Sequence, residues 1–122
     1  MEPQASHVPS QRVSLLLTSR LREPWSVPRL ASTLGVSSRT LHRVVRRECG
    51  VSPMALLRRA RMAEARATLE AAPPDATVTR IALDCGFAHL GRFSQDYAAH
   101  FGESPSDTLR RARRHPGALS TF

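Results

Sequence analysis

The sequence predicts an all-α fold of seven helices, arranged as two helix-turn-helix subdomains joined by a long linker helix. Aromatic residues make up only 5% of the 122 residues, and no segment shows the apolar–polar alternation of a half-buried strand. Apolar residues recur instead at helical spacing, between glycines, prolines and capping serines or threonines. Part of this pattern also occurs twice, which predicts two similar halves.

The first helix is expected from Ser10 to Arg22, after a polar, proline-bearing segment, residues 1–9, that we expect to be a flexible tail. Pro24 lacks the backbone N–H that a continuing helix needs, so the helix should end before it. Four apolar residues form one stripe along this helix: Val13, Leu16, Leu17 and Leu21.

The segment from Trp25 to Gly50 has the pattern of two short helices joined by a tight turn. Ser26 is a candidate N-cap, Pro28 follows in the first turn, and Trp25 precedes the cap, where it can pack onto Leu30. Gly35 permits the positive φ that a sharp turn requires. The residues expected to pack between the two helices are Leu30, Leu34, Val36, Leu41 and Val44. With the first helix, this segment makes the predicted subdomain 10–52.

The second helix of this pair should present polar and cationic side chains to its surroundings. The expected outward residues are Ser38, Arg39, Thr40, His42, Arg43 and Arg46, with Arg47 near the DNA backbone. Arginines and small hydrogen-bonding side chains suit the major groove of DNA, where arginine pairs with guanine. Arg29, near the start of the preceding helix, is a further candidate for phosphate contact.

A longer helix should begin after the Ser52–Pro53 cap and connect the two halves over residues 53–72. About 20 residues at about 1.5 Å each give a helix of about 30 Å, close to one turn of B-DNA. Pro73 and Pro74 end it. Three shorter helices then follow in the second subdomain, 73–114, and residues 115–122 are expected to be a second flexible tail.

An internal repeat relates the two halves. VPRLASTLG (27–35) aligns with VTRIALDCG (78–86), and GVSPMALLRRAR (50–61) aligns with GESPSDTLRRAR (102–113). The shared positions include turn glycines, caps and apolar residues together, so a chance match is improbable. The chain is therefore expected to hold two helix-turn-helix units.

The second unit should present a less basic face. Its expected outward residues are His89, Leu90, Gly91, Arg92 and Gln95. Gln95 is suited to adenine and Leu90 to a thymine methyl group, while Asp96 opposes the charge of Arg92. We therefore expect the first unit to dominate affinity. Because tandem units in one chain lack two-fold symmetry, an asymmetric site bound by a monomer, with modest DNA bending, is expected.

Charge agrees with a nucleic-acid partner. The net charge is +8, and all 18 basic residues are arginine, although a GC-rich coding sequence would produce the same preference for arginine. Cys49 and Cys85 lie far apart without metal-ligand spacing, so we expect no metal, no cofactor and a structural role for both. No signal peptide or membrane-length apolar run is present, which indicates a cytoplasmic protein without membrane contact.

The chain resembles the DNA-binding domain of the AraC/XylS family of bacterial transcription regulators over roughly residues 13–114. The resemblance rests on VPRLASTLGVSSRTLHRVVRRECGVSP and on IALDCGFAHLGRFSQDYAAHFGESPSDTLR, which follows the family pattern IA-x-x-x-GF, F-x-x-x-F and G-x-SP-x-x-x-R. Two residues depart from it, since Ala98 stands where lysine is usual and Thr108 where an aromatic is usual. Both departures would weaken phosphate contact or packing in the second half.

The resemblance implies seven helices, with the third and sixth as recognition helices, and a nucleoid-associated regulator that binds promoter DNA and contacts RNA polymerase. It fits either a short stand-alone member, controlled by its abundance, or a fragment of a longer regulator. Two other classes of function are alternatives. An enzyme is disfavoured because no nucleophile, acid pair or histidine cluster converges in the sequence. A protein-binding adaptor of the transcription machinery is the main alternative, but an arginine-lined helix is atypical of an interface core.

Overall fold

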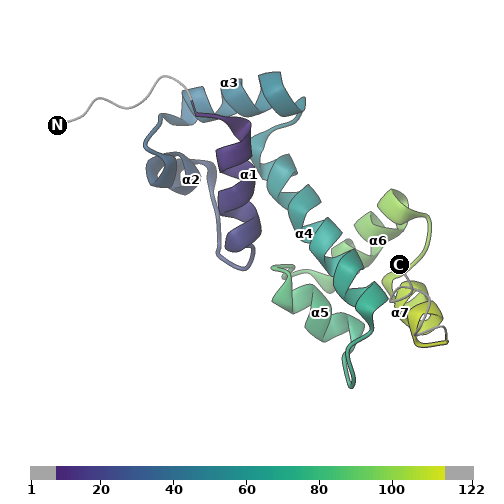
Figure 1. Cartoon of the computed structure of the whole chain (residues 1–122). Helices are drawn as coiled ribbons and strands as arrows, with labels where there is room; N and C mark the ends of the chain where they lie inside the picture. Colours follow the sequence, from purple (N-terminus) through teal and green to yellow (C-terminus); the bar gives the residue numbers. More distant parts are fainter. Residues whose placement is uncertain (1–7, 115–122) are drawn as a thin grey trace. The chain divides into compact units, whose positions relative to one another are not determined.

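The computed structural model describes residues 8–114, and within them it contains seven α-helices and no extended strand (Figure 1). This confirms the predicted all-α fold. The helices are α1 (Ser10–Ser19), α2 (Val27–Leu34), α3 (Ser38–Cys49), α4 (Pro53–Ala71), α5 (Val78–Asp84), α6 (Leu90–Phe101) and α7 (Pro105–Arg114). The two predicted tails lie outside the described residues, except for Val8 and Pro9.

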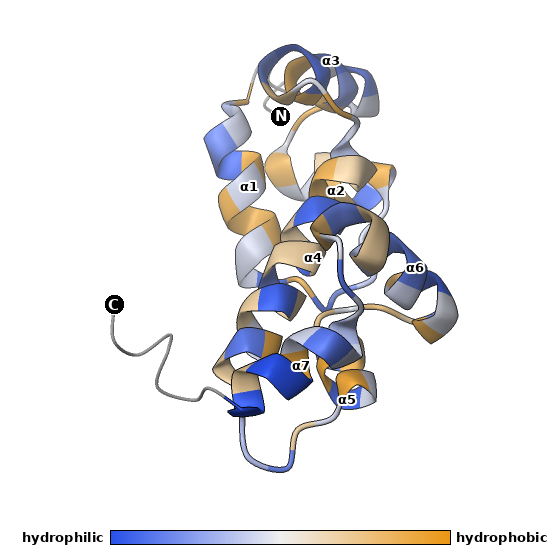
Figure 2. Cartoon of the chain, turned by 90° about the vertical axis from the view of Figure 1, so that its right-hand side faces the viewer, coloured by the Kyte–Doolittle hydropathy of each residue, from blue (hydrophilic) through white to orange (hydrophobic). Residues whose placement is uncertain are grey.

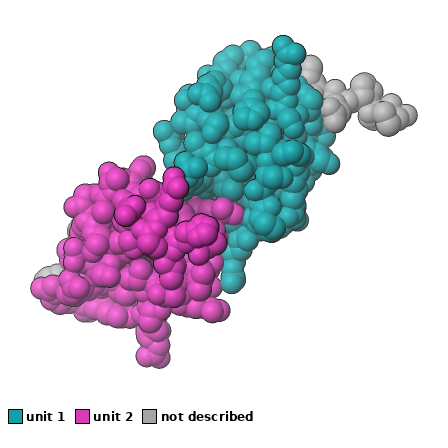
Figure 3. Space-filling view, turned by 180° about the vertical axis from the view of Figure 1, so that it is seen from behind, with its two compact units in different colours: residues 1–60 teal, residues 61–122 magenta. Residues whose placement is uncertain are grey.

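The chain divides into two compact units whose boundary falls inside α4, between Ala60 and Arg61 (Figure 3). Each part of α4 contributes to a different hydrophobic core. Leu57 is buried in the first unit, whereas Met62, Ala65 and Leu69 are buried in the second. The connecting helix is therefore a structural member of both units, because apolar residues along it pack in each core.

The first core is built by α1, α2, α3 and the start of α4. α3 contacts both α1 and α2, and its residues Leu41, Val44 and Val45 are completely buried. They pack with Val13 and Leu17 of α1 in the same cluster. Figure 2 shows the resulting pattern on α3, where hydrophilic and hydrophobic positions alternate along the ribbon. Burial of one face therefore directs the other face of α3 to solvent.

The second core is built by the end of α4 with α5, α6 and α7, and its centre is aromatic. Phe93 and Tyr97 of α6 are 1% and 0% exposed, respectively. The Phe93 ring lies between those of Phe87 and Tyr97, with centroid distances of 4.6 and 5.7 Å. Tyr97 also contacts Phe101 at 4.7 Å between centroids. Tilted ring pairs of this kind add to the free energy of burial, so α6 is held mainly by its aromatic face.

The caps and turns of the two units correspond, as the internal repeat predicts. Ser26 accepts a hydrogen bond from the backbone N–H of Arg29 at 3.2 Å, and Thr77 accepts the equivalent bond from Arg80 at 3.1 Å. Gly35, which ends α2, has φ 73°, a conformation that a side chain would strain. The sequence repeat is thus a structural repeat of cap, helix and turn.

Replacing Ser26 by alanine should lower the free energy of unfolding of the first unit by about 1 kcal/mol, because the N–H of Arg29 would lose its acceptor. Chemical denaturation followed by the fluorescence of Trp25, the chain's one tryptophan, measures this change. The matched substitution Thr77→Ala should leave the Trp25 transition in place. If the midpoint of the Trp25 unfolding transition were unchanged in Ser26→Ala, the cap would be dispensable for the stability of the first unit.

The amino-terminal end of the first unit differs from the sequence expectation in two respects. α1 ends at Ser19 instead of Arg22, because Arg20 leaves the helical conformation at φ −140°. Its carbonyl accepts a hydrogen bond from the indole Nε1 of Trp25 at 2.9 Å, which stabilises the turn. Val8, which was assigned to the tail, is 2% exposed and belongs to the first core. An apolar side chain close to a core packs there even when its neighbours in sequence are polar.

The two cysteines are free thiols in different units. Cys85 is buried in the second core, and Cys49 is half-buried against the first. Within the described residues, no group of three or more histidine, cysteine or acidic side chains is arranged to hold a metal ion.

Thr108, one of the two residues that depart from the family pattern, is completely buried in the second unit. Its hydroxyl lies 2.8 Å from the phenol oxygen of Tyr97 and donates a hydrogen bond to the carboxylate of Glu103. Arg111 donates to the same carboxylate. The position therefore holds a satisfied polar group in place of an aromatic ring.

This arrangement makes the stability of the second unit depend on pH. The hydrogen bonds from Thr108 and then Arg111 lower the pKa of Glu103 below its ordinary value of 4.5. A carboxyl whose pKa is lower in the folded state stabilises the fold above its unfolded pKa, and this contribution is lost as the pH falls through the folded pKa. We expect the second-unit transition to weaken below about pH 4.5 in the wild type and to show less of this dependence in Glu103→Gln. Tyr97 absorbance during denaturation at several pH values measures the stability of the second unit. Identical pH profiles of this stability in wild type and Glu103→Gln would contradict the prediction.

Candidate nucleic-acid interface

The solvent-facing side of α3 carries a stripe of five exposed cationic or titratable side chains. They are Arg39, His42, Arg43, Arg46 and Arg47. Their spacing of three and four residues places them on one face of a helix, opposite the buried apolar residues. Within residues 8–114, the guanidinium groups of Arg39, Arg46 and Arg47 have no ion-pair partner. We name this stripe the α3 face.

The first turn of α3 is set by a local hydrogen-bond network. Ser37 is the N-cap, and its hydroxyl oxygen accepts from the backbone N–H of Thr40 at 3.0 Å. The same hydroxyl donates to Thr40 Oγ1, also at 3.0 Å. Ser38 and Thr40 are half-buried at the edge of the α3 face, whereas the arginines are exposed. The hydroxyl of Thr40 is therefore held in position, but Thr40 exposes less surface to a ligand than the arginines do.

Arg29 is held at the start of α2 by two contacts. Its Nη2 lies 2.5 Å from the carboxylate of Glu23, and its guanidinium stacks on the Trp25 ring at 5.1 Å from the centroid. Arg20 contacts the same ring at 5.5 Å and the same carboxylate. A phosphate at this position would therefore compete with Glu23 for Arg29. The sequence showed no interaction among these four residues, because it depends on where α1 ends.

The outward side of α6 is small and nearly uncharged. Gly91, Arg92 and Gln95 are exposed, as is His89 at the N-cap, whose side chain makes no capping hydrogen bond. The Nε of Arg92 lies 3.8 Å from the carboxylate of Asp96, one helical turn away. The charge of the single arginine on this surface is thus partly neutralised.

Leu90 is placed differently from the other predicted contacts of the second unit. It is half-buried and packs against the second core instead of facing solvent. As the first residue of α6, it lies one helical turn before Phe93 and points to the same side. This placement does not favour contact between Leu90 and a thymine methyl group.

The sequence identified Ala98 only as a departure from the family pattern, and it did not single out Ala99. Ala98 and Ala99 are exposed on the same side as Gln95, and we name the set Gly91, Arg92, Gln95, Ala98 and Ala99 the α6 face. The repeat alignment could have identified them, since these alanines occupy the positions of two arginines in α3. The aligned pairs are Arg39 and Gly91, Arg43 and Gln95, Arg46 and Ala98, and Arg47 and Ala99.

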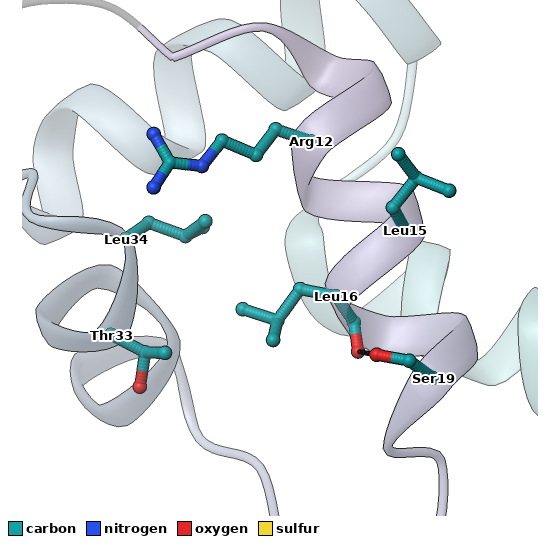
Figure 4. A pocket seen from close by; sticks show the side chains of 6 residues that line it. All are labelled: Arg12, Leu15, Leu16, Ser19, Thr33 and Leu34. Atoms are coloured by element: carbon teal, nitrogen blue, oxygen red, sulfur yellow. Dashed lines mark hydrogen bonds between the residues drawn. The ribbon is translucent and has the colours of Figure 1, made fainter.

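A groove of about 410 Å³ between α5 and α7 is bordered by Arg110, Arg113 and Arg114, and a second groove of about 490 Å³ lies between α1 and α2. Figure 4 shows this second groove, where Leu16 and Leu34 point toward one another and Arg12 lies at the upper edge. Neither lining contains an acid, a histidine or a cysteine. These grooves therefore lack the convergent groups of general acid–base or nucleophilic catalysis.

No helix of the described chain has the length and apolarity needed to cross a bilayer.

Comparisons with known proteins agree with this geometry. Residues 30–111 match the model of a family described as a helix-turn-helix domain. The chain is 38% identical over 107 residues to the XylDLEGF operon transcriptional activator of Pseudomonas putida. The match covers 85% of this chain and 33% of the relative. A probable thc operon regulatory protein of Rhodococcus erythropolis is 40% identical over 95 residues, covering 77% of this chain and 29% of the relative. The chain thus spans about a third of the length of these relatives.

A solved structure shows the same fold. It is a probable AraC family transcriptional regulator from Rhodopseudomonas palustris, with a TM-score of 0.76 and 38% sequence identity. The match covers 84% of this chain and 94% of that one.

Proposed function

The chain belongs to the AraC/XylS family of helix-turn-helix transcription regulators, and from this premise we propose that it binds double-stranded promoter DNA in a sequence-specific manner through the α3 and α6 faces. The family consists of DNA-binding domains of regulators and not of enzymes. The observation that carries the proposal is the α3 face, whose exposed arginines project from a helix that is buried in the first core on its other side.

In this proposal α3 enters the major groove and supplies most of the affinity. Arg39, Arg43 and Arg46 contact base edges, where arginine pairs with guanine O6 and N7. Residues at the start of the helix, Ser38 and Thr40, contact bases or phosphate within hydrogen-bond reach, and His42 lies beside them. Arg47 and Arg29 contact the phosphate backbone, which fixes the register of the helix on the duplex.

The second recognition helix, α6, enters another major-groove segment and contributes specificity with little electrostatic attraction. Gln95 is the residue best suited to base contact there, because its amide can pair with adenine N6 and N7. Gly91, Ala98 and Ala99 let the helix backbone approach the bases closely. His89 and Arg92 contact phosphate or base edges near the start of the helix. To contact DNA, Arg92 must give up its ion pair with Asp96.

Two different recognition helices in one chain imply an asymmetric site and make a monomer sufficient for binding. The family resemblance further suggests that the bound protein contacts RNA polymerase. Selection of binding sites from a random DNA pool tests the proposal. The expected result is two unlike sequence blocks about 10 base pairs apart, the first block bound by α3 and the second block by α6. Recovery of no enriched sequence would exclude sequence-specific binding by this chain.

The competing function is that of a protein-binding adaptor without DNA contact, and salt dependence separates the two. A DNA-binding chain should lose affinity linearly in log[salt], with a slope of about −0.9 for each phosphate neutralised. Replacing Arg47 by alanine should reduce the magnitude of that slope by about one phosphate contact while leaving the preferred sequence unchanged. The control Arg59→Ala, on an exposed position of α4, should leave the slope unchanged. Fluorescence anisotropy of labelled duplexes measures both, and a slope near zero in the wild type would favour the adaptor.

A further inference from the structure

A chain of polar side chains lies on the inner side of α6, opposite the α6 face. Tyr97 and Thr108 are both 0% exposed, and their oxygen atoms are 2.8 Å apart. Thr108 is bonded in turn to Glu103, whose carboxylate also accepts from Arg111. The four residues connect α6 to α7 and to the turn between them, and we name them the Tyr97–Arg111 network.

The hydrogen bonds of this network have one direction. Thr108 has a single hydroxyl proton, which is directed at the Glu103 carboxylate and, at 3.4 Å, at the Ser104 carbonyl, and both of these groups can only accept. Tyr97 must then be the donor toward Thr108 Oγ1. The sequence of donors therefore runs from the phenol through the hydroxyl to the carboxylate, where Arg111 balances the charge. A bond chain that ends on an ion is stronger than one between neutral groups.

The first unit has nothing equivalent at the matching positions of the repeat. Tyr97 aligns with Val45, Glu103 with Val51 and Thr108 with Leu56, all of which pack in or against the first core. Arg111 aligns with Arg59; both are exposed, but the first unit has Val51 in place of the carboxylate that Arg111 contacts. The recognition helix of the first unit is thus held by apolar contacts at the places where that of the second unit is held by directional bonds.

We propose that the Tyr97–Arg111 network positions α6 for base contact, and that the second unit depends on it because its outward face provides almost no electrostatic attraction. This inference rests on the proposed DNA-binding function. Tyr97, Glu103, Thr108 and Arg111 act as positioning residues: Tyr97 and Thr108 are completely buried, and Arg111, which is exposed, acts through the Glu103 carboxylate.

The Tyr97–Arg111 network restricts the rotation of α6 about its axis. Apolar contacts are non-directional, so they discriminate less between neighbouring rotations of a helix than hydrogen bonds do. Hydrogen bonds weaken steeply with misalignment, and therefore the bond from Tyr97 restricts how α6 turns about its axis. A further contact, the Arg66 guanidinium over the Phe101 ring at 4.5 Å, ties the end of α6 to α4. Gln95 can contact a base edge only if this rotation is maintained.

Variants of the Tyr97–Thr108 pair separate positioning from stability. Thr108→Val leaves the buried phenol of Tyr97 without an acceptor, so it should lower both stability and binding to the second sequence block. Tyr97→Phe combined with Thr108→Val removes both polar groups and should recover most of the stability. We expect the double variant to stay about tenfold weaker than wild type on a two-block duplex, the loss of about one base contact. Thr108→Ser, which keeps the hydroxyl, should bind as wild type.

The readout is affinity for duplexes with one block randomised, together with thermal unfolding of each variant. Wild type should lose affinity when either block is randomised, whereas the double variant should be indifferent to the second block and retain the first. Full second-block discrimination in a stable double variant would overturn the inference and leave the proposed function intact. Absence of two-block binding by wild type would instead overturn the proposed function. Arg111→Ala should impair second-block binding and the matched Arg59→Ala should not; equal effects would also count against the network.

Discussion

Replacing Arg43 by alanine is expected to weaken binding to the selected DNA site by about tenfold or more, because a bidentate contact between arginine and guanine contributes about 1–3 kcal/mol. Arg43 lies at the middle of the exposed α3 face, where a major-groove helix makes its closest approach to base edges. The loss should be specific to the first sequence block. Anisotropy titration at one fixed salt concentration measures it.

The matched variant is Arg92→Ala in the second unit. Its effect should be smaller, since Arg92 is shared with Asp96 and projects from a face with no other cation. If Arg92→Ala weakened specific binding as much as Arg43→Ala, the expected dominance of the first unit would be wrong. Binding to DNA of unrelated sequence should fall only slightly in either variant, because the phosphate contacts of the remaining arginines persist.

Replacing Phe93 by alanine should lower the free energy of unfolding of the second unit by about 3–5 kcal/mol, which is comparable to the whole stability of a small domain. The Phe93 ring is buried between Phe87 and Tyr97, so its removal leaves a cavity that the neighbouring rings cannot fill without moving. Because the second unit has a core of its own, the first unit should keep its native transition.

Two intrinsic probes make this measurable, since the chain contains one tryptophan and one tyrosine. Trp25 reports on the first unit and Tyr97 on the second. In Phe93→Ala the Tyr97 transition should move to lower denaturant while the Trp25 transition stays. Leu41→Ala, at the repeat-equivalent position in α3, should do the reverse with a loss of about 2–5 kcal/mol. Coincident movement of both probes in both variants would show that the units unfold as one.

The helices, their caps and the α3 face were predictable from local information. Ser26 and Thr77 cap helices because a hydroxyl three residues before a free N–H can accept it, whatever the rest of the chain does. The α3 face follows from the spacing of its arginines relative to Leu41, Val44 and Val45, since helical periodicity alone separates the two sides. The repeat extended the same argument to the second unit.

Long-range packing decided the remaining features. Leu90 lies three residues before Phe93, so helical spacing places both on one side, but only the packing of α6 shows that Leu90 is partly buried against the core. α1 ends at Ser19 because the Trp25 indole bonds to Arg20, five residues away. The ion pair of Arg29 with Glu23 depends on that same turn.

The sequence by itself thus determined the number and order of the helices, their termini within a few residues, and the cationic face of α3. These features depend on interactions between residues within one or two helical turns. Only the tertiary structure decided that α4 belongs to both cores and that Thr108 joins Tyr97 to Glu103. Those contacts join side chains that the packing of separate helices brings together. They could not be predicted because hydrogen bonding depends on distance and angle in space, and not on spacing along the chain.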